Sequence, residues 1–363
     1  MPTTGPVARP APSLYFVNAP VDFALIGGAS IATWLAMTWL PDAGMGLPVL
    51  VAVFARLCNW PHFAATSYRL YRTRENVRQY PMTALVVPLV VAAGMVWAFV
   101  SPSQVAPLYV KVVLLWSPYH FSGQTLGISL VYARRAGFAV NRFTRFALSG
   151  LIFSAFALAT ARVESGTGMR HYLGIDHPKL GVPPWAVDGL TVALCLFGVL
   201  FTVQVVRWCM RERRLIPPIV LVPLAAQLVW FAVAHDFERF QLLVPFFHSL
   251  QYLLVAWTVQ LAERMAEPGV VPSPRAATVE TARWWGTNVL LGLLLFAVSP
   301  WLCTFLGYDL LFAMAVTSAA VQLHHFFVDG VIWKLANPRV RSPLLANVVR
   351  LMQAAPARMG EAA

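Results

Sequence analysis

Long apolar runs separated by short polar clusters dominate this chain. Ten of them approach or exceed the roughly 20 mainly apolar residues that a helix needs to cross a membrane. These runs cover residues 21–40, 46–70, 81–101, 105–132, 143–161, 185–207, 216–235, 240–262, 284–306 and 308–335. The pattern predicts an all-α fold, a polytopic integral membrane helical bundle with about ten transmembrane helices.

The two ends of the chain do not share this pattern. Residues 1–20 are rich in proline, so we expect a disordered cytoplasmic tail there, followed by a transmembrane helical domain over residues 21–336. Residues 337–363 are expected to form a second cytoplasmic tail. The first apolar run lacks a small-residue cleavage site after it, which favours a retained span over a signal peptide.

Basic residues fall almost entirely on one side of this predicted topology. Clusters of arginine follow the second, fourth, sixth and eighth runs, and further basic residues lie near both ends. The opposite side carries only Arg162, Arg170, Lys179 and Arg239. Because lysine and arginine in short loops mark the cytoplasmic side, we predict that both termini are cytoplasmic (N-in/C-in). The strong preference for arginine over lysine suggests a bacterial inner membrane.

Composition supports a membrane location and excludes other classes. The chain is 58% hydrophobic and 12% charged, against roughly 45–50% and 25% in soluble domains. The formal net charge of +12 does not indicate a nucleic-acid partner, because the charges lie between apolar runs and do not form one basic face. The four cysteines show no C-x-x-C spacing, so no disulfide framework is expected.

Five histidines lie inside four of the predicted spans: His62, His120, His248, His324 and His325. Ionisable residues at membrane depth are costly and therefore mark functional sites. When the helices alternate in direction, these histidines come to similar depths, within about 10 Å at a rise of 1.5 Å per residue. A single buried histidine is more often a packing residue, but five at one level favour a shared site. We therefore predict that all five are metal ligands.

In each of the four spans, one histidine has a polar neighbour about one helical turn away, on the same helix face. The pairs are Asn59 with His62, Gln124 with His120, Gln251 and Tyr252 with His248, and Asp329 with His325. Metal-bound imidazoles usually donate their second N–H to such groups. Asp329, Tyr252 and Gln124 are therefore the candidate catalytic residues, with Asp329 either a ligand or the partner of one.

Two further features lie close to the histidines. Pro61 and Pro118 precede His62 and His120 and are expected to loosen the local helix. Gly123 and Gly127 form a G-x-x-x-G pattern beside His120, which is typical of close packing between helices.

The chemistry that fits this pattern is oxidative. No nucleotide-binding loop, serine-hydrolase elbow or zinc-protease motif occurs. Membrane desaturases and hydroxylases hold iron through clustered histidine boxes, whereas only His324 and His325 are clustered here. The pattern of single histidines on separate helices is closer in style to that of membrane carotenoid-cleaving oxygenases, but this chain shares no motif with them. The resemblance is to a general strategy and not to one family.

The leading hypothesis is a membrane-embedded non-haem metal-dependent oxidoreductase, of oxygenase, desaturase or hydroxylase type. The expected cofactor is a transition metal, iron before copper or zinc. The expected partners are a membrane lipid or isoprenoid substrate and an electron donor, with no nucleic acid. Three alternatives stay open: a haem protein with His120 and His248 as axial ligands, a proton-coupled transporter with a histidine relay, and a lipid head-group transferase or hydrolase.

Overall fold

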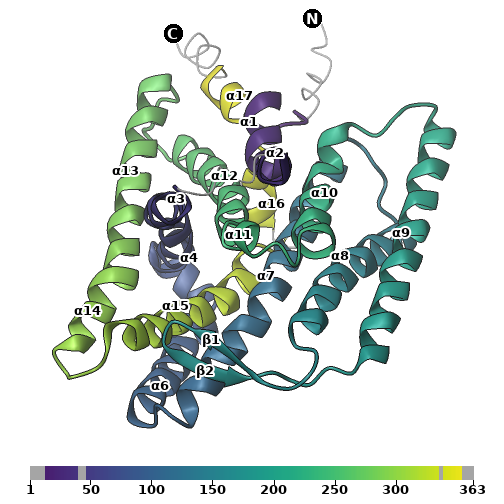
Figure 1. The fold of residues 1–363 in the computed structure, drawn as a ribbon. Coiled ribbons are helices and arrows are strands. Elements are labelled where there is room, and N and C mark those ends of the chain that lie inside the picture. Colours follow the sequence, from purple (N-terminus) through teal and green to yellow (C-terminus); the bar gives the residue numbers. More distant parts are fainter. Residues whose placement is uncertain (1–12, 40–45, 335–337, 354–363) are drawn as a thin grey trace, which may run out of the picture.

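The computed structural model describes residues 13–39, 46–334 and 338–353. Within these ranges the chain is a bundle of helices with one small two-stranded sheet (Figure 1). The longer helices are α2 (Ala29–Trp39), α3 (Leu47–Phe54), α4 (Trp60–Tyr71), α6 (Val87–Val100), α7 (Val105–Arg135), α8 (Arg142–Val163), α9 (Pro184–Glu212), α10 (Val222–Leu228), α12 (Val244–Met265), α13 (Pro274–Leu293) and α15 (Leu310–Ile332).

Short helices and helical turns connect or extend these. The short α-helices are α1 (Ala19–Phe23), α5 (Arg74–Gln79), α11 (Glu238–Gln241), α14 (Ser299–Thr304), α16 (Pro338–Leu344) and α17 (Val348–Gln353). The π-helical turns are η1 (Ala24–Gly28), η3 (Ala55–Asn59), η4 (Met82–Val86), η6 (Val229–Val233) and η7 (Leu294–Val298), and η5 (Pro218–Val220) is a 3₁₀ turn. The strands are β1 (Met169–Tyr172) and β2 (Ile175–Pro178).

Eight stretches of the described chain are long and apolar enough to cross a membrane. They are Ala19–Trp39, Leu47–Tyr71, Met82–Val100, Arg142–Val163, Pro184–Glu212, Glu238–Met265, Pro274–Thr304 and Leu310–Ile332. The structure thus supports an all-α membrane bundle. Two of the ten predicted spans are not among the eight. One is α7, which is 31 residues long but carries buried polar side chains along its length, and the other contains only a shorter apolar helix, Val222–Val233.

Burial separates the central helices from the peripheral ones. The most apolar windows of α12 and α15 are 67% and 61% buried inside the protein, whereas that of α9 is 6% buried. In Figure 1, α9 and α13 form opposite edges of the molecule, with α4, α7, α12 and α15 between them. An exposed apolar face such as that of α9 suits contact with lipid. Helices α12 and α15 therefore lie in the interior of the bundle.

The two prolines near the histidines have different surroundings. Pro61 lies in the first turn of α4, directly after the π-helical turn η3, where its missing N–H costs little. Pro118 lies inside α7, and this helix continues through it without a break. One turn later, the Ser122 hydroxyl donates to the Pro118 carbonyl over 2.8 Å. The loosening expected at Pro118 therefore does not interrupt the helix.

The predicted tails are more ordered than expected where the structure describes them. Phe16 is fully buried, and the Val348 N–H donates to its carbonyl over 3.0 Å. Arg135, at the end of α7, donates to the Tyr15 and Leu344 carbonyls over 3.0 and 2.8 Å. The first and last described segments therefore pack together against α7. Residues 1–12 and 354–363 of the predicted tails lie outside the described residues.

A β-hairpin covers the opposite end of α7. Lys111 of α7 forms a buried ion pair with Glu164 over 2.5 Å, and Glu164 also accepts the Leu180 N–H over 3.0 Å. His177 of β2 lies 3.4 Å from the Lys111 ammonium. Burial and then the Lys111 charge lower the pKa of His177, so its neutral ring accepts this contact. One polar cluster thus anchors the hairpin to the bundle.

Candidate metal centre

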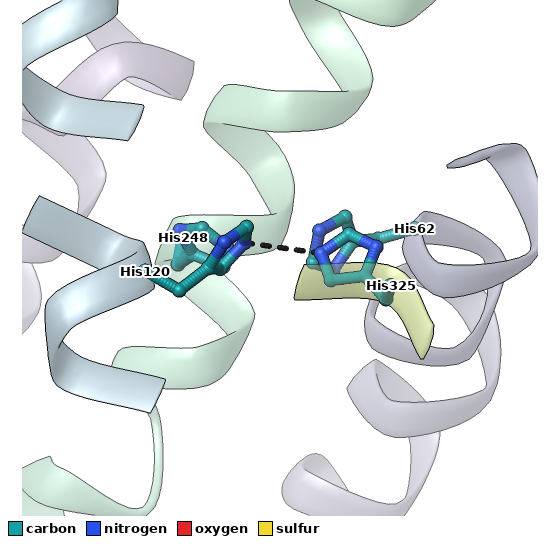
Figure 2. A group of neighbouring side chains, drawn as sticks. All are labelled: His62, His120, His248 and His325. Carbon is teal, nitrogen blue, oxygen red and sulfur yellow. Dashed lines mark hydrogen bonds between the residues drawn. The ribbon is translucent and has the colours of Figure 1, made fainter. Parts of the chain in front are cut away.

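Four helices bring four imidazoles to one point in the interior. His62 of α4, His120 of α7, His248 of α12 and His325 of α15 each offer one nitrogen, and these four atoms lie within 4.8 Å of one another. Figure 2 shows His120 and His248 facing His62 and His325, with the Nε2 atoms of His120 and His325 3.0 Å apart. The convergence expected from the alternating helix directions is therefore present for these four histidines.

The distances between these four ring nitrogens are close to those between the ligands of one transition-metal ion. Histidine nitrogens bind zinc at about 2.0–2.1 Å, so ligands on opposite sides of such an ion are about 4 Å apart. The observed separations need only small side-chain movements to meet this geometry. Imidazole suits zinc, copper and iron alike. The four residues present therefore fit a single ion.

Hydrogen bonding within the group is incomplete. Four of its buried ring nitrogens have no hydrogen-bond partner among the described residues: His62 Nε2, His325 Nδ1 and both nitrogens of His248. Buried polar atoms in proteins are nearly always paired, and each exception needs an explanation. A bound cation would take the lone pair of one nitrogen from each ring, so it would explain at most three of these four exceptions.

The hydrogen bonds of Ser249 define the tautomer of His62. Ser249 lies next to His248 on α12, and its hydroxyl contacts the Pro245 carbonyl at 2.7 Å and His62 Nδ1 at 3.1 Å. A hydroxyl has one hydrogen, and a carbonyl only accepts. The Ser249 hydrogen therefore goes to Pro245, and His62 Nδ1 donates its own proton to Ser249. This leaves the lone pair of His62 on Nε2, the unpaired atom that a metal ion can bind.

Asp329 lies directly beside the four histidines. Its Oδ2 is 3.5 Å from Nε2 of His325 and 3.8 Å from Nε2 of His120. Its Oδ1 accepts hydrogen bonds from the Thr66 hydroxyl at 3.0 Å and the Trp333 indole at 3.2 Å. One oxygen is thus fixed by donors, while the other faces the imidazoles. The predicted pairing of Asp329 with His325 is present, and the position suits either a ligand or an orienting partner.

The other predicted neighbours take part less directly. The Tyr252 hydroxyl contacts Thr66 at 2.5 Å and Asp329 Oδ1 at 3.4 Å, and its ring packs on His62. Gln124 donates to the His248 carbonyl over 3.0 Å, although it was expected to pair with His120. The Asn59 side-chain amide lies 2.9 Å from the same Ser249 hydroxyl and so reaches His62 only through it. These side chains hold the backbone and the rings in position.

His324 is separate from this group. Its Nε2 lies 3.2 Å from the Tyr71 hydroxyl, and its ring stacks on that tyrosine. Consecutive residues of an α-helix point about 100° apart, so His324 and His325 cannot both face one interior point. The structure thus brings together four of the five histidines predicted as ligands.

The sequence reasoning did not single out Thr66, Ser249 or Trp333. Thr66 and Trp333 follow His62 and Asp329 by four residues, so the same helix-face rule would have found them. Ser249 contacts a histidine on another helix, which no spacing along the chain reveals.

A cavity of about 820 Å³ adjoins the centre. His120, Gln124, Tyr252 and Asp329 line it, so all three predicted catalytic residues face the same space. Gly123 and Gly127 line it as well, and a Cβ atom on either would meet nothing within 4 Å. The close helix packing expected from the G-x-x-x-G pattern is therefore wrong, because these glycines widen a cavity.

Asp329→Asn is expected to weaken metal binding about 10- to 100-fold, the usual cost of losing a group that orients a ligand. The substitution keeps the shape of the side chain and removes its charge. Competition with a chelator of known affinity measures the change. Asp309→Asn is the matched control, since Asp309 caps the start of the same helix and asparagine caps equally well. Equal metal affinity in both variants would contradict a role for Asp329 at the centre.

Comparisons with models of protein families, with curated proteins and with solved structures found no match to this chain.

Proposed function

We propose that this protein is a membrane-embedded, non-haem, metal-dependent oxidoreductase that acts on a lipid or isoprenoid. The observation that carries the proposal is the cluster of four interior histidines, three of which have buried ring nitrogens without a hydrogen-bond partner among the described residues. The adjoining cavity supports it, because an apolar substrate there would lie against the centre. Iron is the proposed metal, with copper and zinc as alternatives.

The proposed topology has ten spans, with both termini in the cytoplasm of a bacterium and the bundle in its inner membrane. The contact between the first and last described segments supports an even number of crossings. Arg135 connects both segments to the end of α7, and basic residues concentrate in the loops assigned to that side. In this topology α7 and the helix Val222–Val233 are the fourth and seventh spans, which complete the eight candidates to ten.

The proposed reaction is oxidation of a C–H bond by dioxygen. Hydroxylation consumes one O₂, two electrons from a donor and two protons, and yields the alcohol and one water. Bound iron would supply the redox chemistry that reduces dioxygen. The chain itself would supply protons, since Asp329 contacts the hydroxyls of Thr66 and Tyr252 on the side away from the imidazoles. The cavity walls would hold the substrate and exclude water from the rest of the centre.

A haem would explain less of the site. Two axial histidines would leave the other two, with their unpaired nitrogens, without a role. A proton relay would in turn need continuous hydrogen bonds through His248, and both ring nitrogens of that residue lack a partner in the described part of the chain. The observed cluster therefore favours direct metal binding.

The test is elemental analysis of the purified protein together with mass spectrometry of lipids from cells that express it under ¹⁸O₂. We expect about one equivalent of iron and an ¹⁸O-labelled lipid that is absent from cells expressing the Asp329→Asn variant. A Soret band, or a histidine cluster that binds no transition metal, would overturn the proposal. Iron without any oxidised product would leave a metal centre but refute the oxidoreductase activity.

A further inference from the structure

The cavity beside the candidate metal centre is lined by apolar side chains and by two cations. Its lining includes the apolar side chains of Trp116, Leu130 and Phe326 and the cations Arg145 and Lys334, which follow the C-terminal ends of α7 and α15 in the chain. Both cations are exposed, and neither has an acidic partner among the residues that the structure describes. The cavity therefore presents unpaired positive charge next to a hydrophobic channel.

The cavity follows α7 for a considerable distance. Lining residues run from Trp116 to Val131 on this helix, which corresponds to about 22 Å at 1.5 Å per residue. Facing α7 are residues of α15, from Phe326 to Val331. The volume of about 820 Å³ lies within the range of roughly 300–1,000 Å³ found for pockets that enclose one small organic molecule. Length and volume together suit a single extended chain.

The sides of the cavity are accessible from the membrane. Tyr119 and Phe327 line it and are 51% and 41% exposed. In a bilayer such exposed aromatic surface meets lipid chains, and interfacial cations meet the head groups. A molecule from the membrane can thus enter sideways, with its polar end at Arg145 and Lys334.

We propose that the substrate is a single-chain amphiphile with an anionic end group, a carboxylate or a phosphate, bound by Arg145 and Lys334. Its apolar chain lies along α7 and passes His120 and Asp329. This inference rests on the proposed function and names its substrate class. His120 and Val131 are eleven positions apart on α7, or about 16 Å, so the carbon beside the centre lies well along the chain and away from the anionic group.

Binding measurements on the purified, metal-loaded protein test the assignment. The probes are palmitate, farnesyl phosphate and the uncharged farnesol. We expect at least one anion to bind about tenfold more tightly than farnesol, and the double variant Arg145→Gln/Lys334→Gln to remove this preference while farnesol binding stays unchanged. Tighter binding of palmitate identifies a carboxylate site, and tighter binding of farnesyl phosphate identifies a phosphate site.

Matched variants separate the cavity from general surface charge. Arg142 is exposed in the same first turn of α8 and does not line the cavity, so Arg142→Gln should bind the anion like the parent protein. Gly127→Leu fills the cavity and should abolish binding of every probe. Gly189→Leu, on α9, changes a glycine with equally open surroundings and should have no effect.

The outcomes distinguish this inference from the proposed function. Equal affinity for the anions and farnesol, or an anion preference that survives the double variant, would overturn the assigned substrate class even if the metal is bound. Absence of metal in a protein that still binds the anion through Arg145 and Lys334 would overturn the proposed function and leave the binding site intact.

Discussion

Replacing His325 with alanine is expected to empty the metal centre, whereas replacing its neighbour His324 is expected to leave it filled. His325 is buried within the cluster, and one of its ring nitrogens lies 3.0 Å from His120. Loss of a ligand should weaken metal binding by at least about 100-fold, more than the loss of an orienting partner. Metal content per chain, measured by elemental analysis after purification, gives the result.

The adjacent His324 makes this comparison unusually well matched. The two variants change the same residue type, on the same helix, at neighbouring positions. His324 contacts Tyr71, so its loss should lower stability slightly and leave the metal in place. Comparable loss of metal in both variants would show that the His325 effect is a general disturbance of α15. Full metal content in His325→Ala would refute the four-histidine centre.

The second large effect is expected at the buried ion pair between Lys111 and Glu164. Their side chains are 7% and 5% exposed, so removal of either partner leaves a buried charge without compensation. Breaking such a pair typically costs about 3–5 kcal/mol. Glu164→Gln should therefore strongly lower the stability of the protein, which denaturant unfolding in a fixed detergent mixture measures.

The matched variant removes both charges. Lys111→Met/Glu164→Leu replaces the pair with apolar side chains of similar length, and such replacements are often neutral or stabilising. We expect it to recover most of the stability that Glu164→Gln loses. A double variant as unstable as the single one would contradict the assignment of the Glu164→Gln effect to an uncompensated buried charge.

Hydropathy was sufficient to predict the membrane bundle, since eight of the apolar runs are helices of spanning length. It also predicted α7, as the run 105–132, although Lys111, His120 and Gln124 interrupt the apolar pattern of this helix. The π-helical turns, including η3 just before His62, were not predicted. They insert one extra residue into a helical turn, and no residue type marks that insertion.

Position within a helix was sufficient to bring the histidines to one level, but not to choose among them. Depth is the same for His324 and His325, and only the packing of α15 determines which ring faces inward. Packing also decides the role of Gly123 and Gly127, which line a cavity and do not contact a neighbouring helix of the described chain. A small residue lets a neighbouring helix approach or leaves space for a ligand, and the sequence does not state which neighbour is present.

Phe16 and Leu344 both line the cavity beside the metal centre, although they lie near opposite ends of the chain. Arg135 fixes this arrangement through carbonyls of both segments. One wall of the cavity therefore forms only when these two segments have packed together. A chain shortened before Leu344 would therefore lack part of this cavity wall, even though it would keep all four histidines of the cluster.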